Sequence, residues 1–261
     1  LVDGRCPDHL QEPEQTKERN LFFRLSRYEQ DLERLLSSDC LRIQPTGRKE
    51  EILNFVRSGL RDISISRPAE RVSGWGIPVP GQEDQIIYVW IDALINYLSG
   101  LGFGSGETWA QTWNDTSHKT HVVGKNVWKF HAVYWPALLL SAKLDLPDRI
   151  CVHGFLTVDG RKISKSLGNT VDPMSCIEGY GSDAVRLLLL SYPTNTDGDF
   201  TEERLSATYN SLLANGVGNL ASRVTALAER VGHREQVQTA APLGRPAADV
   251  LSAVVDFRFS D

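Results

Sequence analysis

The sequence predicts an α/β protein in which a parallel sheet is followed by a helical region. Three stretches rich in β-branched and aromatic residues, 86–90, 121–123 and 149–153, are typical of buried strands. Helical patterns follow the first two, and strands that alternate with helices indicate parallel pairing. Beyond Asp172 the chain turns helical, with helices expected over 182–190 and 202–231.

The first part of the chain, residues 14–60, is expected to be mainly helical. Ser26 and Glu29 have the spacing of a capping box, in which their side chains accept hydrogen bonds from backbone N–H groups at the start of a helix. A second helix is expected over about 49–58 and ends at Gly59. Alternation over 62–66 predicts a strand bounded by Pro68, and the glycines and prolines of 74–81 predict a shaped loop.

The middle and end of the chain give further local expectations. The apolar run 86–90 predicts a strand buried on both faces that ends at Trp90. Ala93, Leu94, Tyr97 and Leu98 then share one side of a helix, and a later helix is expected over 126–143. Asp199 and Thr201 precede the long C-terminal helix, whose first N–H groups both side chains can satisfy.

Composition excludes several classes of protein. The chain has 261 residues and a formal net charge of -5, which argues against a general nucleic-acid coat, so any RNA contact requires a local basic patch. The apolar run 132–142 is interrupted by Pro136 and is shorter than the ~20 residues of a membrane span. Because the N-terminus shows no secretory signal, we expect a cytoplasmic protein with no membrane partner.

The cysteines predict neither a disulfide framework nor a metal centre. Four cysteines stand far apart in the sequence. Cys6 and His9 have the spacing of half a zinc site, but no second half follows, and a closed site needs about four ligands. A plain turn is the preferred interpretation, and no metal ligand is assigned.

Residues 153–169 carry the most informative pattern. A strand runs into the Asp159-Gly160 turn, and Lys162 and Lys165 then stand three residues apart between the hydroxyls of Ser164 and Ser166. An ammonium group on a flexible stem suits a polyphosphate, and hydroxyl and backbone N–H groups add donors around it. A solvated basic turn is the alternative for two lysines at this spacing.

These seventeen residues resemble the KMSKS loop of class I aminoacyl-tRNA synthetases, with Ile163 in place of the usual methionine. The preceding stretch 153–160 resembles the methionyl-tRNA synthetases in particular, as do 73–98 and, at the end of that family's connective insertion, 19–68. The resemblance covers roughly residues 5–231. It implies the second half of a Rossmann-like parallel-sheet nucleotide-binding domain followed by an α-helical bundle.

The resemblance divides the chain into four parts: 1–68 as the mostly helical end of the insertion, 69–171 as the catalytic half, 172–200 as a linking subdomain, and 201–261 as the truncated start of an anticodon-binding-like helical bundle. It implies that a carboxylate attacks the α-phosphate of ATP to give an aminoacyl adenylate. Lys165 would contact the leaving pyrophosphate with help from Lys162. Mg²⁺ is expected because it normally accompanies ATP.

The resemblance also assigns binding residues. The implied ATP site comprises Gly124, Asn126, His153, Gly154, Phe155, Ser164, Lys165 and Ser166. The family's Gly-x-Asp motif reads Gly124-Lys125-Asn126 here, and asparagine brings no negative charge to a charged partner. This departure favours a specialised relative over a full synthetase.

An apolar amino acid, methionine above all, is the implied substrate. The family's methionine pocket corresponds to Trp90, Ala93, Tyr97, Val127 and His131. Aromatic faces suit a polarisable thioether, since each sulfur–aromatic contact contributes about 0.3–1.5 kcal/mol. On spacing alone, aromatic side chains in this pattern are more often part of a hydrophobic core than of a binding pocket.

Two features limit the resemblance. The family's His-x-Gly-His element and the first strand–helix units of its sheet have no counterpart, which predicts a shortened chain, one half of a split protein, or a rearranged relative that the missing half could complete as a covalent or non-covalent partner. Asn219 and Arg223 match positions that contact the tRNA anticodon, but an ordinary solvated pair on one helix face is an equal alternative. Binding of tRNA is expected only in a fuller protein.

Three functions therefore stay open. The first is ATP-dependent activation of methionine followed by transfer to tRNA. The second is a relative in specialised metabolism that joins an activated amino acid to a small-molecule acceptor, as in hydrazine formation. The third is an inactive module that binds a nucleotide or an amino acid as a scaffold; the absent histidine element favours it, and the two loop lysines oppose it.

Overall fold

The structure is a computed structural model that describes residues 12, 17–106, 108–115, 118–164, 168–231 and 245–257. Contacts divide these residues into two compact units. The first unit draws on Leu1–Arg34, Asn54–Ser117 and Val133–Leu146, and the second on Leu35–Leu53, His118–Ala132 and Pro147–Asp261. The half zinc site expected at Cys6 and His9 lies outside the described residues.

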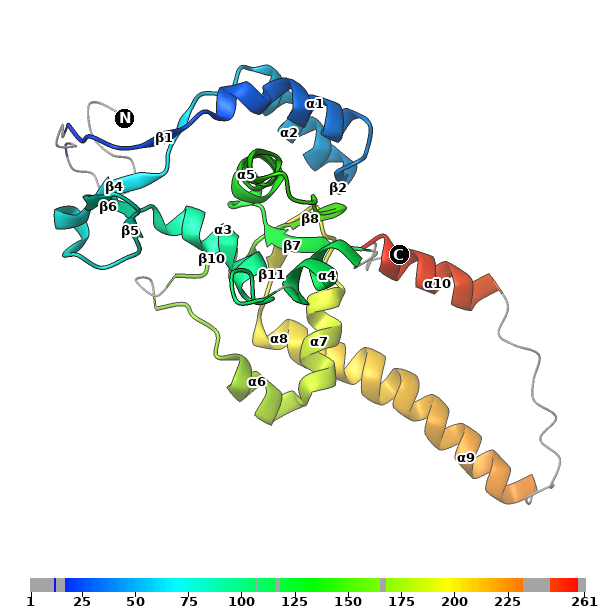
Figure 1. Ribbon diagram of the computed structural model, residues 1–261. Coiled ribbons are helices and arrows are strands. Elements are labelled where there is room, and N and C mark those ends of the chain that lie inside the picture. Colours follow the sequence, from blue (N-terminus) through cyan, green and yellow to red (C-terminus); the bar gives the residue numbers. More distant parts are fainter. Residues whose placement is uncertain are drawn as a thin grey trace. The chain divides into compact units, whose positions relative to one another are not determined.

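The first unit combines short antiparallel strands with helices (Figure 1). β1 (Phe22–Phe23) pairs with β3 (Ile63–Ser64), and a sheet in the order β4-β6-β5 joins β4 (Ser66–Pro68), β6 (Gln82–Ile87) and β5 (Pro78–Val79). Its helical elements are the 3₁₀ turns Leu25–Tyr28 and Ala69–Val72 and the helices α3 (Val89–Ser99), α4 (Thr108–Asp115) and α5 (Trp135–Ala142). Two further helices, α1 (Glu29–Ser37) and α2 (Thr46–Arg57), run from one unit into the other.

The second unit contains a three-stranded parallel sheet (Figure 1). β8 (Arg149–His153) lies between β2 (Arg42–Gln44) and β7 (Thr120–Gly124), and both neighbours are parallel to it. Ile150, Cys151 and Val152 are all buried because β8 has a strand on each side and is covered on both faces. The predicted α/β class with a parallel sheet is confirmed.

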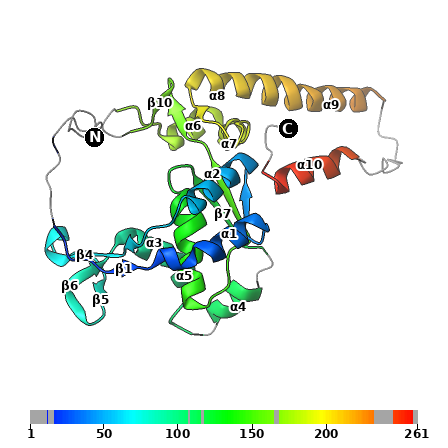
Figure 2. The same cartoon turned by 90° about the horizontal axis from the view of Figure 1, so that it is seen from above.

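The rest of the second unit follows this sheet along the chain. β9 (Leu156–Val158) pairs antiparallel with β10 (Arg161–Lys162) and parallel with β11 (Gly198–Asp199). The helices are α6 (Pro173–Tyr180), α7 (Ser182–Leu190), α8 (Glu202–Thr208), α9 (Asn219–Val231) and α10 (Arg245–Val255). A π-helical segment, Tyr209–Gly218, joins α8 to α9, and Figure 2 shows the three as one continuous rod.

Polar caps explain where these helices begin. The Asp172 carboxylate accepts hydrogen bonds from the N–H groups of Met174 and Ser175 at 3.0 and 3.3 Å, which caps α6. Thr201 caps α8 by accepting a hydrogen bond from the Arg204 N–H at 3.2 Å, as expected. Ala184, Val185, Leu188, Phe200 and Leu205 form the buried core of this helical part.

Several local expectations were wrong. Ser26 does not cap a helix: it lies in a 3₁₀ turn, and its hydroxyl donates a 2.6 Å hydrogen bond to Asp62. Glu29 accepts a hydrogen bond from the N–H of Leu60 instead. Pro68 is inside β4 rather than beyond a strand. Asp199 does not serve α8, since its carboxylate accepts a hydrogen bond from Thr157.

Two elements also begin or end at other residues than predicted. The expected strand 86–90 ends at Ile87 in an antiparallel sheet, so Trp90 lies in the first turn of α3. The expected helix 126–143 begins only at Trp128, after a turn, and passes through a π-helical segment, Phe130–Tyr134. No helix in the described part of the chain is long and apolar enough to cross a membrane.

Candidate functional site

The candidate nucleotide site begins at the carboxyl ends of two neighbouring parallel strands. Gly124, the last residue of β7, is the register partner of His153, the last residue of β8. The Lys125 N–H donates a 2.9 Å hydrogen bond to the His153 carbonyl, so the turn after β7 lies against the segment after β8. Open α/β sheets bind ligands at this edge. The sheet therefore brings Gly124 and Asn126 together with His153, Gly154 and Phe155.

Two glycines let backbone segments approach closely at this edge. A Cβ atom at position 124 would lie 3.0 Å from the Asn126 side-chain oxygen, so the asparagine side chain folds back over the glycine. A Cβ atom at position 154 would lie 2.0 Å from the Thr196 carbonyl oxygen. The Gly154 N–H also donates a 3.0 Å hydrogen bond to the Thr194 carbonyl. No side chain fits at position 154 without a backbone shift.

Lys125 and Asp197 tie the turn after β7 to the segment before β11. The Lys125 ammonium lies 2.7 and 2.8 Å from the two carboxylate oxygens of Asp197, and the Phe155 N–H donates to the same carboxylate at 2.8 Å. These hydrogen bonds, led by that of Lys125, lower the pKa of Asp197. The carboxylate thus holds Lys125 and Phe155 in one place.

Two ammonium groups lie near the Phe155 ring. Lys125 Nζ lies 4.5 Å from the ring centroid, and Lys162 Nζ lies 5.9 Å from it. Asp197 pairs with Lys125. Because Asp197 offsets the charge of Lys125, Lys162 supplies the net positive charge beside this ring, and an ammonium group on a flexible stem suits a polyphosphate.

The hairpin that carries Lys162 has a well-defined turn. Asp159 and Gly160 have φ values of 51° and 69°, the left-handed pair expected of a two-residue hairpin turn. Asp199 braces it, because its carboxylate accepts hydrogen bonds from the Thr157 hydroxyl at 2.7 Å and the Gly160 N–H at 2.8 Å. These bonds lower the pKa of Asp199. Lys162 ends β10 with an exposed side chain.

The side chain of Asn169 bridges two backbone groups of residues 162–169, the lysine-bearing loop. Asn169 accepts a 2.9 Å hydrogen bond from the Ser164 N–H and donates a 3.1 Å hydrogen bond to the Lys162 carbonyl. Lys165 and Ser166, which the sequence assigned to this site, lie outside the described residues.

The expected amino-acid pocket residues of the first unit all lie on α3. Trp90, Ala93 and Tyr97 are exposed on one face of that helix, whereas the adjoining face with Ile91, Leu94 and Leu98 is buried, so the expected common side of Ala93, Leu94, Tyr97 and Leu98 is divided. The Tyr97 ring lies 6.0 Å from the Trp135 ring, centroid to centroid. Partial burial raises the pKa of the Tyr97 hydroxyl. Trp90 and Tyr97 are thus partly open aromatic surfaces rather than fully buried core.

The other two pocket residues belong to the second unit. Val127 is half-buried, whereas His131 is buried in the π-helical segment, where its Nδ1 lies 3.1 Å from the Val127 carbonyl oxygen. The rings of His121 and His131 are 5.7 Å apart between centroids. Burial lowers the pKa of His131, and burial together with His131 lowers that of His121 to about 4. Both imidazoles are therefore neutral near pH 7.

The two residues expected to contact an anticodon are on α9. Asn219 and Arg223 stand four residues apart, on one face of the helix, and both are exposed.

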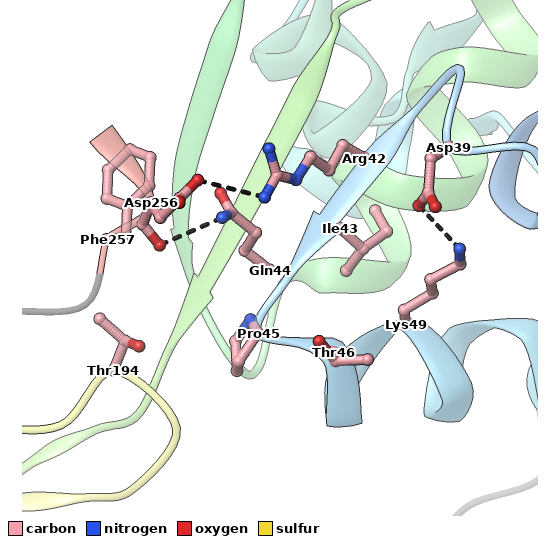
Figure 3. A pocket seen from close by; sticks show the side chains of 10 residues that line it. All are labelled: Asp39, Arg42, Ile43, Gln44, Pro45, Thr46, Lys49, Thr194, Asp256 and Phe257. Atoms are coloured by element: carbon pink, nitrogen blue, oxygen red, sulfur yellow. Dashed lines mark hydrogen bonds and ion pairs between the residues drawn. The ribbon is translucent and has the colours of Figure 1, made fainter. Parts of the chain in front are cut away.

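A cavity of about 640 Å³ lies elsewhere in the second unit, at the carboxyl end of β2 (Figure 3). Its charged side chains are paired, Arg42 with Asp256 at 3.1 Å and Lys49 with Asp39 at 2.7 Å. Gln44 donates a 3.1 Å hydrogen bond to the Asp256 carbonyl. None of the site residues predicted from the sequence lines this cavity.

The sequence did not identify four residues that organise the nucleotide site: Lys125, Asn169, Asp197 and Asp199. Asp197 and Asp199 reach their partners 39 to 72 positions away only because β11 pairs with β9. No local pattern singles out Asn169, because the backbone groups that it binds lie five and seven residues earlier in the chain.

Comparisons with known proteins agree with this geometry. A family model described as tRNA synthetases class I (M) matches residues 1–225. The methionine–tRNA ligase of Nostoc sp. is 47% identical over 85% of this chain and 42% of its own length. The chloroplastic/mitochondrial methionine–tRNA ligase of Arabidopsis thaliana is 40% identical over 98% of this chain and 42% of its own length.

Solved structures give the same answer. The Mycobacterium tuberculosis methionyl-tRNA synthetase in complex with methionyl-adenylate superposes with a TM-score of 0.81 at 37% identity, over 98% of this chain and 51% of that one. The chain spans less than half the length of the two curated relatives above. On the family model, the sequence identity and the superposition together, this chain belongs to the class I tRNA synthetases, in their methionyl-tRNA synthetase family.

Proposed function

We propose that this chain supplies half of a site that activates methionine with ATP, and that the full-length protein transfers the activated methionine to tRNA. One observation carries the proposal: the turn Gly124–Asn126 and the segment His153–Phe155 lie together at the carboxyl ends of β7 and β8, beside the ammonium groups of Lys125 and Lys162. The named activity of the relatives supports the same conclusion.

The proposed chemistry is adenylate formation. A methionine carboxylate oxygen attacks the α-phosphorus of ATP, the bond to the bridging oxygen of the β-phosphate breaks, and pyrophosphate leaves with the electron pair. Negative charge grows on the phosphate oxygens, so fixed cations stabilise the transition state. Lys165 is assigned to the leaving pyrophosphate, with Lys162 assisting. The remaining assigned contacts to ATP are Gly124, Asn126, His153, Gly154, Phe155, Ser164 and Ser166.

The donor set fits a nucleotide. At position 124 a glycine leaves room for the Asn126 side chain at the edge of the sheet, and the hairpin beyond β8 adds the Lys162 ammonium. Mg²⁺ is expected to arrive with ATP on the phosphate oxygens. The described residues contain no group of three or more His, Cys, Asp and Glu side chains that could hold a metal, so we assign it no protein ligand.

For the amino acid, we assign Trp90, Ala93, Tyr97, Val127 and His131. A neutral, buried His131 suits an apolar substrate, because a charged imidazolium beside a thioether would have to be desolvated. Aromatic faces add sulfur–aromatic contacts of about 0.3–1.5 kcal/mol each. The solved relative with bound methionyl-adenylate supports methionine as the substrate.

The acceptor is tRNA in this proposal, with Asn219 and Arg223 as its contacts on α9. A small-molecule acceptor is the second candidate. It is favoured by one observation, the neutral Asn126 where the resemblance implies an acidic residue. Its side chain sits beside Gly124 at the edge of the sheet.

ATP–pyrophosphate exchange tests the proposal. We would assay a panel of amino acids with the full-length protein that carries this chain, and with this chain by itself. Methionine-dependent exchange by the full-length protein is expected. Exchange only with another amino acid would favour the second candidate, and exchange with none would refute activation altogether.

The role of Lys165 is tested in the same assay. Lys165→Ala should lower the exchange rate at least about tenfold, because it removes the charge that we assign to the leaving pyrophosphate. Lys17→Ala removes an exposed lysine outside the assigned site and serves as the matched control. An unchanged rate in Lys165→Ala, with the control also unchanged, would show that the assignment is wrong.

A further inference from the structure

We propose that Asn169 is a positioning residue of the activation site, because its side-chain amide clamps the two ends of the lysine-bearing loop together. The carboxamide oxygen accepts the hydrogen bond from the Ser164 N–H at 2.9 Å, and the carboxamide NH₂ donates to the Lys162 carbonyl at 3.1 Å. One side chain thus binds the backbone on both sides of Ile163. The inference rests on the proposed function and deepens it.

The clamp requires both halves of an amide. Ser164 offers a donor and Lys162 offers an acceptor, so the bridging group must accept and donate at once. Aspartate supplies only acceptors when it is ionised, and alanine supplies neither. Gly168, with φ of 66°, lets the chain turn back directly before Asn169. The turn at Gly168 thus places the Asn169 carboxamide between the Ser164 N–H and the Lys162 carbonyl.

The clamp acts through Lys162. The carbonyl that Asn169 binds belongs to the residue whose ammonium lies 5.9 Å from the Phe155 ring, next to Lys125 at 4.5 Å. Asp199 fixes the other end of the same hairpin through Thr157 and Gly160. With both ends of the hairpin held, the β10 backbone keeps the Lys162 ammonium beside the Phe155 ring.

Loss of the clamp should misalign Lys162 with the phosphates of ATP during the reaction. Misplacement of a catalytic group by about 1 Å is enough to lower a rate about 10²-fold. Asn169 itself contacts neither substrate in this proposal, and the methionine residues lie on α3 and in the 127–131 segment. Its loss should therefore lower kcat and raise KM for ATP while KM for methionine stays the same.

Two variants of Asn169 separate the clamp from general damage. Asn169→Ala removes both hydrogen bonds, and Asn169→Asp keeps the acceptor for Ser164 but loses the donor to Lys162. Both should lower the exchange rate of the full-length protein about tenfold to hundredfold, with KM for methionine unchanged within about twofold. Asn114→Ala, an exposed residue of α4, is the matched control and should behave as wild type.

Hydrogen–deuterium exchange of the Ser164 amide gives a readout independent of activity. The amide should exchange faster in Asn169→Ala than in wild type and should stay protected in Asn169→Asp, because only alanine lacks the acceptor. Equal Ser164 exchange in wild type and Asn169→Ala would overturn the clamp. So would a wild-type rate of pyrophosphate exchange in Asn169→Ala, or a change confined to KM for methionine.

The two proposals fail in different ways. If the wild-type protein shows no pyrophosphate exchange with any amino acid, activation is refuted, and the Ser164 amide still decides whether the clamp exists. If methionine-dependent exchange is present and Asn169→Ala leaves it intact, activation stands and the clamp is refuted.

Discussion

Asn126 is the residue at which this chain departs most from the chemistry of its family. Its side chain folds over Gly124 at the carboxyl end of β7, where it is exposed to an incoming ligand. An amide can hydrogen-bond a hydroxyl or an ammonium group, but it contributes no charge. A carboxylate of the same size would occupy the same space and bind a cationic partner more strongly.

We therefore expect Asn126→Asp to improve adenylate formation. A charge-assisted hydrogen bond exceeds a neutral one by about 1 kcal/mol, so kcat/KM in pyrophosphate exchange should rise about threefold to tenfold. Asn114→Asp introduces the same charge at an exposed position of α4 and should leave kcat/KM unchanged. A lower or unchanged kcat/KM in Asn126→Asp would mean that the site is adapted to a neutral partner, as the small-molecule acceptor requires.

At the scale of helices and strands, local sequence patterns correctly predicted those elements whose tertiary contacts favour the same structure as the local pattern. β8 over Arg149–His153 and α7 over Ser182–Leu190 match their predicted bounds, since a doubly buried strand and an amphipathic helix each have an unambiguous pattern. The apolar run 86–90 was ambiguous. Its second half joins α3 because Ile91, Leu94 and Leu98 bury one face of a helix that begins at Val89.

Contacts between distant parts of the chain could not be predicted. Ser26 finds Asp62, 36 positions away, in place of its local capping partner. β2 has only three residues, so its place in the parallel sheet depends on the register with β8. The resemblance supplied the assigned residues from Gly124 to Ser164, and the sheet places the turn after Gly124 beside His153, while their roles stay predictions. Its braces, Asp197 and Asp199, depend on a sheet that no local pattern specifies.

These braces predict a pH dependence of stability. Hydrogen bonds from Lys125 and Phe155 lower the pKa of Asp197, and bonds from Thr157 and Gly160 lower that of Asp199, both from an ordinary value of 3.8. A carboxyl whose pKa is lower in the folded state stabilises the fold above its unfolded pKa. That stabilisation is lost as the pH falls through the folded pKa, here below about pH 4.

The double variant Asp197→Asn, Asp199→Asn tests this. At pH 7 its Tm should be below that of the wild type by about 2–4 °C, a small effect because both carboxylates are solvent-screened. The difference should shrink below pH 4, where the wild-type carboxylates become protonated. Thermal melts from pH 7 to pH 2.5 measure it, with Glu178→Gln on exposed α6 as the control. A difference that is constant with pH would contradict the assignment.

At the scale of the whole molecule, the C-terminal helical rod presents an uncovered apolar stripe. Val217, Leu220, Val224, Leu227 and Val231 are 57–72% exposed. Their spacing alternates between three and four residues, so they form one continuous seam along α9 and the end of the π-helical segment. Such seams are typical of helices that pack against other helices, and the chain matches only part of its relatives' length.

We expect the seam to make this chain, taken alone, associate with a second copy through α9. Sedimentation velocity across a range of concentrations should show a dimer that grows with concentration. Leu220→Glu with Leu227→Glu should return the chain to a monomer, because each glutamate would bury an unpaired charge in the seam. Ser222→Glu places the same charge on α9 outside the seam and should leave the dimer intact. A chain that is monomeric at every concentration, with or without the glutamates, would show that the stripe tolerates water without a partner.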